Sequence, residues 1–315
     1  MEHFFIDKSF CNFDEFAHAA QVWDLHFKQL DKGEFRTDML QFASNNSLIA
    51  HARFNRHFDQ HGSPPPGKWT FAIFSEQTLP FVWHGKKISN NTISIYKPGS
   101  EIDSVTQPGF ETFVLSYTEE YLNELCADFG LPEINKLANG TDLFKCSLME
   151  LSRIRQQLHQ EIDSLKNRSP KVDILSSIRK WEIDFPEQIL MILSRSLPVT
   201  SSSLRERHRA IKLIKQYLAE FPHEPVTVVQ LCKIAGVSIR TLQYAFHEHY
   251  SVTPKTYLKN FRLNGVRREL WNSDPLVTRV NDIATIWGFW HMGQFAADYR
   301  KLFCELPSET LLRRK

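Results

Sequence analysis

The chain has 315 residues, of which 42% are hydrophobic and 23% charged, and its formal net charge is +2. This composition is typical of a soluble globular protein, and the length predicts two domains. Because no stretch approaches ~18 uncharged apolar residues, a membrane-spanning helix is excluded.

The net charge divides unevenly along the chain. Residues 205–315 contain 18 Lys and Arg against 10 Asp and Glu, a net charge of +8, whereas residues 1–204 contain 20 against 26, a net charge of −6. A basic C-terminal part predicts binding to a polyanion. Charge alone leaves open whether that polyanion is DNA, RNA or an anionic membrane.

The five cysteines are widely scattered, and none has a CxxC or metal-ligand spacing. The N-terminus has no basic region followed by an apolar run, and Asp7, Asp14 and Glu15 interrupt it early. We therefore expect a cytoplasmic protein with reduced thiols and no cofactor. The cysteines are Cys11, Cys126, Cys146, Cys232 and Cys304.

Residues 35–117 contain short segments rich in Phe, Ile and other aromatic residues, separated by turn signals such as Asn45-Asn46 and Pro98-Gly99. Several strands at this spacing predict a β-sandwich or a small barrel. The segment Glu119–Phe129 then predicts a helix that ends at Gly130. The expected strands are Arg36–Ala43, Ser47–Asn55, Trp69–Phe74, Phe81–His84, Thr92–Tyr96 and Glu111–Tyr117.

Two longer helical stretches follow within residues 118–198. Apolar residues recur at helical spacing over 148–165 and over 174–193, and Pro186 predicts a bend in the second stretch. The polar run after Pro198 predicts a linker at 199–204 between a domain at 1–198 and a domain at 205–315. The pattern leaves open whether these helices pack on their own domain or against a second copy of the chain.

The C-terminal part contains an internal repeat. Leu231–Val237 matches Ile283–Phe289 at an offset of 52 residues, and Leu242 pairs with Phe295 at an offset of 53. One inserted residue in the second turn explains the change of offset. A pattern shared over two such stretches predicts two copies of one structural unit.

Each copy predicts a helix, a tight turn and a second helix. Gly236 and Gly288 can adopt the positive φ that the turn needs. Ser238 suits the N-cap of the first copy's second helix, which we expect to end near His249. The second copy's second helix is expected at about 290–302.

This arrangement is a helix-turn-helix, whose second helix enters the major groove of DNA. Between the copies, residues 254–271 predict one helix, about 27 Å long at ~1.5 Å per residue. Such a spacer would hold the two reading helices roughly one DNA turn, ~34 Å, apart. The alternative is a plain helix bundle, which the duplicated turn and the basic charge disfavour.

Residues 205–315 resemble the DNA-binding domain of the AraC/XylS family of regulators. The residues that carry the resemblance in the first copy and in the helix after it are Leu231, Ala235, Gly236, Val237, Ser238, Arg240, Leu242, Gln243, Phe246, Pro254, Tyr257, Leu258, Arg262 and Leu263. The second copy adds Asp282, Ile283, Ala284, Gly288, Phe289, Gln294, Phe295, Pro307 and Ser308. The segments 287–299 and 262–265 are most similar to the ethanolamine-operon regulators. The family often has Gly where Cys304 stands, so a different local turn is expected there.

Candidate DNA contacts lie on the exposed positions of both second helices. Arg240 can bind guanine and Gln243 adenine in bidentate fashion, so we expect the first copy to carry most of the base readout. The candidates for base readout are Ser238, Arg240, Thr241, Gln243, Tyr244, His247, His291, Met292 and Gln294. The candidates for phosphate contacts are Lys255, Lys259, Arg262, Arg300 and Lys301. Trp290 is interpreted as either exposed or part of the core.

The resemblance implies a cupin-like β-barrel that binds a small effector or mediates dimerisation, and Pro98-Gly99-x-Glu101 agrees with that fold. The expected fold is therefore α+β: this barrel with a helical extension, then an all-α domain with two tandem helix-turn-helix units. His51, His57, His61 and His84 lack the spacing of a metal cupin. The candidate effector-binding residues are Arg53, Trp69, Phe71, Trp83 and Tyr96.

The sequence thus predicts a sequence-specific DNA-binding transcription regulator that is no enzyme, and an effector-responsive activator is favoured. The expected partners are double-stranded DNA, a small-molecule effector, RNA polymerase and a second copy of the chain, with no membrane. Two alternatives remain open. The N-terminal domain could serve dimerisation only, or it could be a catalytic metal cupin fused to a DNA-binding domain.

Overall fold

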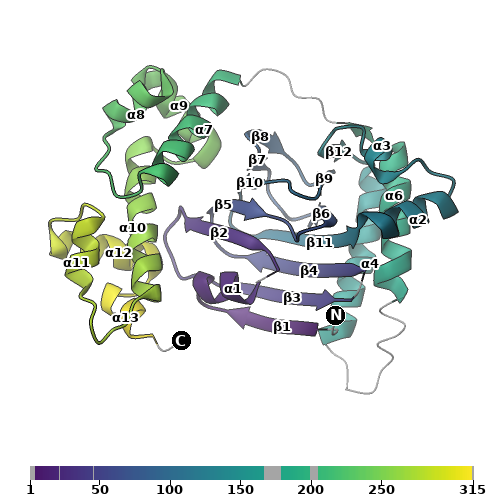
Figure 1. The fold of residues 1–315 in the computed structure, drawn as a ribbon, viewed down its shortest axis with the longest axis horizontal. Helices are drawn as coiled ribbons and strands as arrows, with labels where there is room; N and C mark the ends of the chain where they lie inside the picture. The colour runs from purple at the N-terminus through teal and green to yellow at the C-terminus, as the bar shows by residue number, and fades with distance from the viewer. Residues whose placement is uncertain (1–3, 21, 45, 167–178, 199–204, 314–315) are drawn as a thin grey trace.

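The computed structural model describes residues 4–20, 22–44, 46–166, 179–198 and 205–313. A sheet-rich N-terminal part precedes a helical C-terminal part (Figure 1), which confirms the predicted α+β fold. Within the described residues, none of the helices combines the length and the apolar composition that a membrane crossing requires.

The N-terminal part contains two antiparallel sheets. The larger has eight strands in the order β1-β3-β4-β11-β6-β9-β12-β13, and the smaller has five in the order β2-β5-β10-β7-β8. The large sheet comprises β1 (Phe4–Phe10), β3 (Thr37–Ala43), β4 (Ser47–Phe54), β11 (Phe110–Thr118), β6 (Lys68–Phe74), β9 (Thr92–Tyr96), β12 (Leu143–Lys145) and β13 (Leu197–Pro198). The small sheet comprises β2 (Asp24–Gln29), β5 (Phe58–Ser63), β10 (Ile102–Val105), β7 (Phe81–Trp83) and β8 (Lys86–Ile88).

Among the described residues the strands form two separate antiparallel sheets, as in the β-sandwich that the sequence also predicted, and strand pairing does not close them into one barrel. The short helix α1 (Phe13–Ala19) follows β1 and contacts both β1 and β2, which are edge strands of different sheets. Helix α1 lies beside these two edge strands (Figure 1). Phe16 and the other apolar residues of α1 pack between the sheets.

Strand structure also begins earlier than predicted. β1 and β2 precede residue 35, where the sequence analysis expected the β-rich region to start. Asp7, Lys8 and Asp24 interrupt the apolar pattern in these two strands, because both are edge strands with side chains exposed to solvent.

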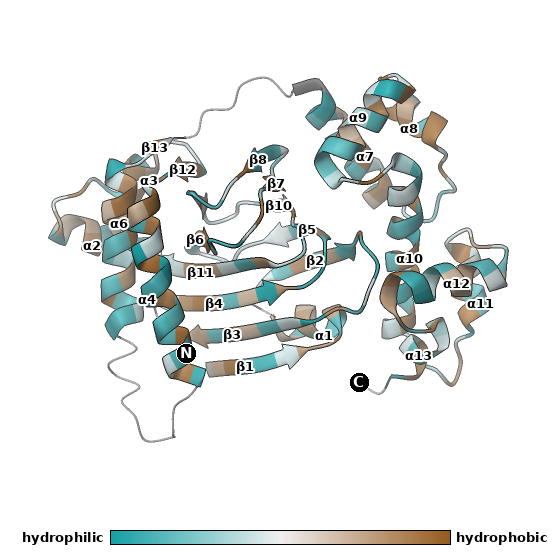
Figure 2. Ribbon diagram, turned by 180° about the vertical axis from the view of Figure 1, so that it is seen from behind, coloured by the Kyte–Doolittle hydropathy of each residue, from teal (hydrophilic) through white to brown (hydrophobic). Residues whose placement is uncertain are grey.

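A helical layer covers the outer face of the large sheet (Figures 1 and 2). It packs on outward-facing residues of the central strands, including Leu40, Ile49 and Phe113. Pro186 lies in the first turn of the last helix, directly after a π-helical turn, and residues 167–178 of the predicted stretch lie outside the described residues. The layer comprises α2 (Glu119–Asp128), α3 (Ile134–Ala138), α4 (Leu148–Lys166), η1 (Lys180–Asp184) and α6 (Phe185–Arg195).

The C-terminal part contains the two predicted helix-turn-helix units, joined by the long helix α10. The first unit is α8 and α9, the second is α11 and α12, and α7 and α13 flank them. The helices are α7 (Arg205–Glu220), α8 (Val228–Ala235), α9 (Ile239–Tyr250), α10 (Pro254–Asn272), α11 (Val280–Ile286), α12 (Met292–Phe303) and α13 (Pro307–Leu312).

Both glycine turns have the expected backbone conformation, with φ of +67° at Gly236 and +79° at Gly288. These values lie in the left-handed region that glycine adopts without steric cost. Cys304 ends α12 in the same region, with φ of +60°. The chain therefore keeps a left-handed turn at this position without a glycine.

Candidate DNA-binding surface and effector cavity

Helix α9 presents the predicted first-copy residues on one exposed face. The Ser238 hydroxyl accepts a hydrogen bond from the backbone N–H of Thr241 at 3.1 Å and so caps the helix. Because Leu242 and Phe246 are buried, the opposite face of α9 is left to solvent. Ser238, Arg240, Gln243, Tyr244 and His247 are exposed, and Thr241 is partly exposed.

Arg240 is positioned by a neighbouring ring. Its guanidinium lies 5.7 Å from the centre of the Tyr244 ring, one helical turn further along α9. This cation–π contact holds the side chain along the exposed face. The geometry leaves the planar guanidinium available for a bidentate contact to a base edge.

Helix α12 offers fewer polar groups. His291 and Gln294 are exposed, whereas Met292 is partly buried and packs against the core. Trp290 is 73% exposed, so its ring belongs to the surface rather than to the core. Its place beside the N-terminus of α12 makes it a candidate contact that the sequence analysis left undecided.

The five predicted phosphate-binding cations differ in their surroundings. Lys259 forms an ion pair with Asp298 at 3.0 Å, which ties α10 to α12. Arg262 is partly buried and donates to the carbonyl oxygen of Val226 at 3.0 Å, and burial lowers the pKa of its guanidinium. Lys255, Arg300 and Lys301 are exposed.

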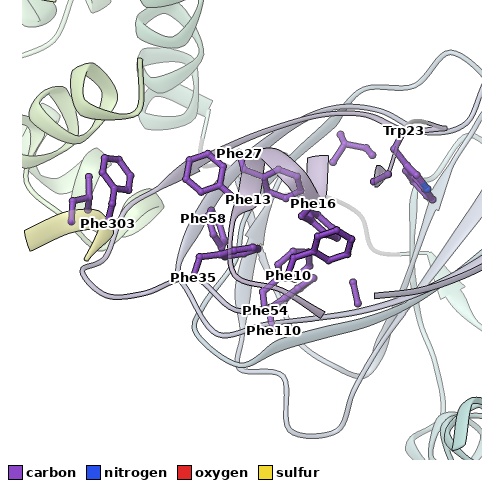
Figure 3. Close-up of a cluster of buried hydrophobic side chains, with 14 of the residues drawn as sticks. Phe10, Phe13, Phe16, Trp23, Phe27, Phe35, Phe54, Phe58, Phe110 and Phe303 are labelled. Atoms are coloured by element: carbon purple, nitrogen blue, oxygen red, sulfur yellow. The ribbon is translucent and has the colours of Figure 1, made fainter. Parts of the chain in front are cut away.

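A cavity of about 80 Å³ lies between the two sheets of the N-terminal part. Its walls are mostly aromatic and aliphatic, and Phe16, Trp23, Phe54 and Phe110 border it (Figure 3). Residues from α1, from both sheets and from the segment between α1 and β2 contribute to the lining. An apolar space with few polar groups is typical of a small-molecule site.

The structure does not gather the five predicted effector-binding residues into one pocket. Tyr96 lines the cavity and accepts a hydrogen bond at 2.8 Å from the indole N–H of Trp83. Trp69 and Phe71 belong to the cluster beneath the helical layer, because alternate residues of β6 face opposite sides of the sheet. Arg53 lies on that same outer side, in a polar pocket beside α4.

The predicted histidines take separate positions. His51 pairs with Glu111 at 2.8 Å on the outer face of the large sheet. His57 is buried at the end of the small sheet, and His61 and His84 are partly buried. Throughout the described ranges, no group of three or more His, Cys, Asp and Glu side chains is placed to hold a metal ion.

One face of α10 is clamped onto the N-terminal part. The Asn264 side chain accepts from the backbone N–H of Gln29 at 2.9 Å and donates to the carbonyl oxygen of the same residue at 3.0 Å. Asn260 donates to the carbonyl oxygen of Leu30 at 2.8 Å. These amides satisfy main-chain groups at the end of β2, an edge strand.

Arg267 extends the clamp to α1. Its guanidinium pairs with Asp14 and, at 2.9 Å, with Glu305, and it lies 4.1 Å from the centre of the Phe13 ring. Arg267 is only 3% exposed, so its charge is compensated almost entirely within the protein. Figure 3 shows Phe303, from the end of α12, facing the phenylalanine cluster around Phe13.

A second buried charge cluster joins α7 to the small sheet. Lys215 lies 3.1 Å from Asp59 and 2.6 Å from Asp103, and the Tyr257 hydroxyl donates to Asp59 at 2.9 Å. Burial disfavours the ionised carboxyl of Asp59, but Lys215 and Lys28 outweigh that effect and hold its pKa below the usual range.

Sequence reasoning missed this interface between the two parts of the chain. Its partners are far apart in sequence, as with Gln29 and Asn264, which are 235 residues apart. A single sequence carries no periodic signal that pairs such positions. Asn260, Asn264 and Arg267 are buried in α10 among apolar residues, and nothing in the local pattern indicates that these polar side chains are buried.

Comparison with known proteins assigns the C-terminal part. Residues 231–313 match a family model described as a helix-turn-helix domain. A probable thc operon regulatory protein of Rhodococcus erythropolis is 39% identical over 101 residues, which cover 32% of this chain and 30% of that protein. The structure of the AraC-like transcriptional activator CuxR aligns with 88% of this chain and 99% of its own, at 14% identity and a TM-score of 0.43.

The first relatives are matched over about a third of their length, from 30% to 38%. A shorter relative is covered more fully: XylDLEGF operon transcriptional activator 2 of Pseudomonas putida is 33% identical over 113 residues, 36% of this chain and 72% of that protein. The family-model match at residues 231–313 takes in most of both helix-turn-helix units. The chain therefore belongs to the AraC/XylS family of DNA-binding transcription regulators.

Proposed function

We propose that this protein is an effector-responsive transcription activator that reads two adjacent major grooves with α9 and α12. The main support for this proposal is that α10 makes two connections. It joins the two helix-turn-helix units, and it is bound to the N-terminal part through Asn264 and Arg267. A change in the N-terminal part can thereby reach both reading helices. Several relatives are transcriptional activators by name, which supports activation rather than repression.

The length of α10 fits this reading. It has 19 residues, about 28 Å at ~1.5 Å per residue. Reading helices on adjacent turns of B-DNA are separated by ~34 Å. Arg240 and Gln243 on α9 supply direct base contacts, while Trp290 and Gln294 on α12 supply contacts of lower hydrogen-bonding capacity.

Helix α1 connects the cavity to α10. Phe16 lines the cavity, and Asp14, two residues earlier, pairs with Arg267. A ligand that displaces Phe16 must move a seven-residue helix whose other side holds the clamp. We therefore place the effector in the cavity between the sheets, with Tyr96 as one contact.

Further partners belong to the same proposal. An activator of this kind contacts RNA polymerase, and we propose a second copy of the chain as a partner through the N-terminal part. We propose that the protein acts in the cytoplasm, together with its target DNA. We also propose that it is not an enzyme. Residues 287–299 are similar to ethanolamine-operon regulators, so ethanolamine is one of the compounds to test as an effector. The described residues that line the cavity include no Asp or Glu to pair with its ammonium group.

The proposal is tested by selecting duplexes from a random-sequence pool with the full-length protein at ~0.15 M salt. We expect an enriched site with two half-sites about 10 base pairs apart. Fluorescence anisotropy then measures the affinity for that site and for a shuffled duplex. Failure to enrich any sequence at this salt concentration would contradict the proposed function.

Effector response is measured separately on the enriched duplex. A ligand that raises the melting temperature of the full chain should also change its DNA affinity or its activation of transcription in a purified polymerase assay. If ligands bind but neither quantity changes, the N-terminal part serves dimerisation only.

A further inference from the structure

The cavity exists because small side chains meet in the middle of the large sheet. Val114 of β11 lies opposite Ala50 of β4 on one side and opposite Ala72 of β6 on the other. Ala52 and Thr112 form the neighbouring pair. All five side chains line the cavity, so its floor is a patch of small residues beneath the aromatic wall.

Gln41 is the unusual residue of this lining. It lies on β3 opposite Ala50, and its side chain has no exposed surface. Neither its amide nitrogen nor its amide oxygen has a hydrogen-bond partner among the described residues. A buried amide without partners is destabilising, since it loses hydrogen bonds to water and gains none in the fold.

The rest of the lining is uncharged. The described residues that border the cavity include no Lys, Arg, His, Asp or Glu. An ionised ligand would therefore be buried without a counter-charge, which is strongly unfavourable. The polar groups that accompany Gln41 are side chains of Gln60, Tyr96, Ser104 and Thr112.

Resting on the function proposed above, we propose that the effector is a small uncharged carboxamide that pairs with Gln41. An amide presents one donor and one acceptor side by side, and so does the glutamine side chain. The two amides can form a pair of hydrogen bonds while the hydrocarbon part of the ligand contacts the alanine floor. This pairing satisfies both unpartnered atoms of Gln41 at once.

The size of the cavity limits the ligand. A volume of about 80 Å³ is well below the ~300 Å³ of a typical small-molecule pocket. A short branched chain suits this space, whereas a nucleotide or a corrinoid is far too large. Isobutyramide is a suitable probe, and isobutyrate is its anionic counterpart of nearly equal shape.

The test compares these two probes on the full chain by thermal shift and calorimetry. We expect saturating isobutyramide to raise the melting temperature by about 5 °C and isobutyrate to leave it unchanged. Gln41→Leu keeps the side-chain volume and removes the amide, so the variant should fold and bind isobutyramide at least about tenfold more weakly. Gln77→Leu, at an exposed position outside the cavity, is the matched control and should bind like the parent.

Each other result overturns the proposal. Equal binding of isobutyrate contradicts an uncharged ligand, and equal binding by the Gln41→Leu variant contradicts the pairing with Gln41. Absence of isobutyramide binding to the parent contradicts the carboxamide class. Ala72→Leu, which fills the floor, should abolish binding; if this variant does not fold, Ala50→Val takes its place.

These outcomes are independent of the proposed regulator function. Enrichment of a specific duplex tests DNA recognition whether or not an amide binds. If the protein selects a specific duplex but does not bind isobutyramide, the proposed regulator function is supported and the carboxamide ligand is contradicted. A protein that binds isobutyramide and selects no duplex gives the converse result.

Discussion

Arg240 and Gln243 are exposed because Leu242 and Phe246 occupy the buried side of the same helix. The spacing of 3.6 residues per turn then fixes which α9 side chains can reach a base. Trp290 shows the reverse case, since its aromatic ring is 73% exposed next to the N-terminus of α12. At this scale the structure shows which of the candidate side chains are exposed.

Replacement of Arg240 should affect sequence discrimination. We expect Arg240→Ala to weaken binding to the enriched duplex by about 1–3 kcal/mol, roughly 5- to 150-fold, because a bidentate base contact is lost. Affinity for a shuffled duplex should change much less. Anisotropy titrations on both duplexes check this, and an equal loss on both would assign Arg240 to the phosphate backbone.

Replacement of Lys255 should act differently. This exposed residue follows Pro254 at the start of α10, and we expect it to contact a phosphate. Lys255→Ala should weaken binding to all duplexes alike and lower the slope of log affinity against log salt by about 1. Lys87→Ala, an exposed lysine on β8, is the control and should leave the slope unchanged. A loss confined to one sequence would contradict the phosphate role.

Helix α10 combines two tasks on different faces. One face separates the helix-turn-helix units, and the other carries Asn260, Asn264 and Arg267 into the N-terminal part. Gly265 allows the ring of Trp287, the residue after α11, to pack closely against α10. A Cβ atom at Gly265 would lie 2.1 Å from that ring. Only glycine permits this close approach, despite its cost within a helix.

The contact between α10 and the N-terminal part can be weakened by substituting one residue of this helix, Asn264. Asn264→Leu removes the two hydrogen bonds to Gln29 and leaves its main-chain groups buried without partners. We expect a loss of about 1–3 kcal/mol in the free energy of unfolding and a weakened effect of any ligand on DNA binding. Asn272→Ala, exposed at the end of the same helix, is the control. Chemical denaturation measures the stability, and unchanged coupling in Asn264→Leu would contradict the clamp as the route between the sites.

The molecule as a whole buries charge between its two parts. Lys215 pairs with Asp59 and Asp103 across the boundary between the two parts, and Arg267 pairs across it with Asp14. Neutral histidines are buried in the same region. Burial lowers the pKa of His249 to about 4, and it lowers those of His57 and His61 to about 4 as well.

These histidines predict acid sensitivity. In the unfolded chain these histidines bind protons below about pH 6.5. In the folded chain they stay neutral down to about pH 4. The free energy of unfolding should therefore fall as the pH drops through this window, by on the order of 1 kcal/mol per histidine at pH 5.5. His249→Gln should reduce this dependence, and His291→Gln, at an exposed position, should not. Melting temperatures from pH 7 to pH 5 check the trend; a flat profile would contradict it.

The two helix-turn-helix units were largely predictable from the sequence, because most of their signals are local. The glycine turns and the Ser238 cap each depend on residues within one helical turn or one short turn of the backbone, and the repeat shows the same local pattern twice. The predicted effector residues were less informative. Trp69 and Phe71 have the composition of a pocket, but the alternation of β6 directs them to the outer face.

The sequence by itself determined the two helix-turn-helix units and their spacing, since helical periodicity and turn chemistry operate over a few neighbouring residues. Only the tertiary structure decided where the cavity and the clamp lie. Ala50, Ala72 and Gln41 come from three strands, and Asn264 meets Gln29 across 235 positions of the chain. Such contacts depend on the order of the strands in the sheet and on how the two parts pack together. Neither can be read from residues that are neighbours in the sequence.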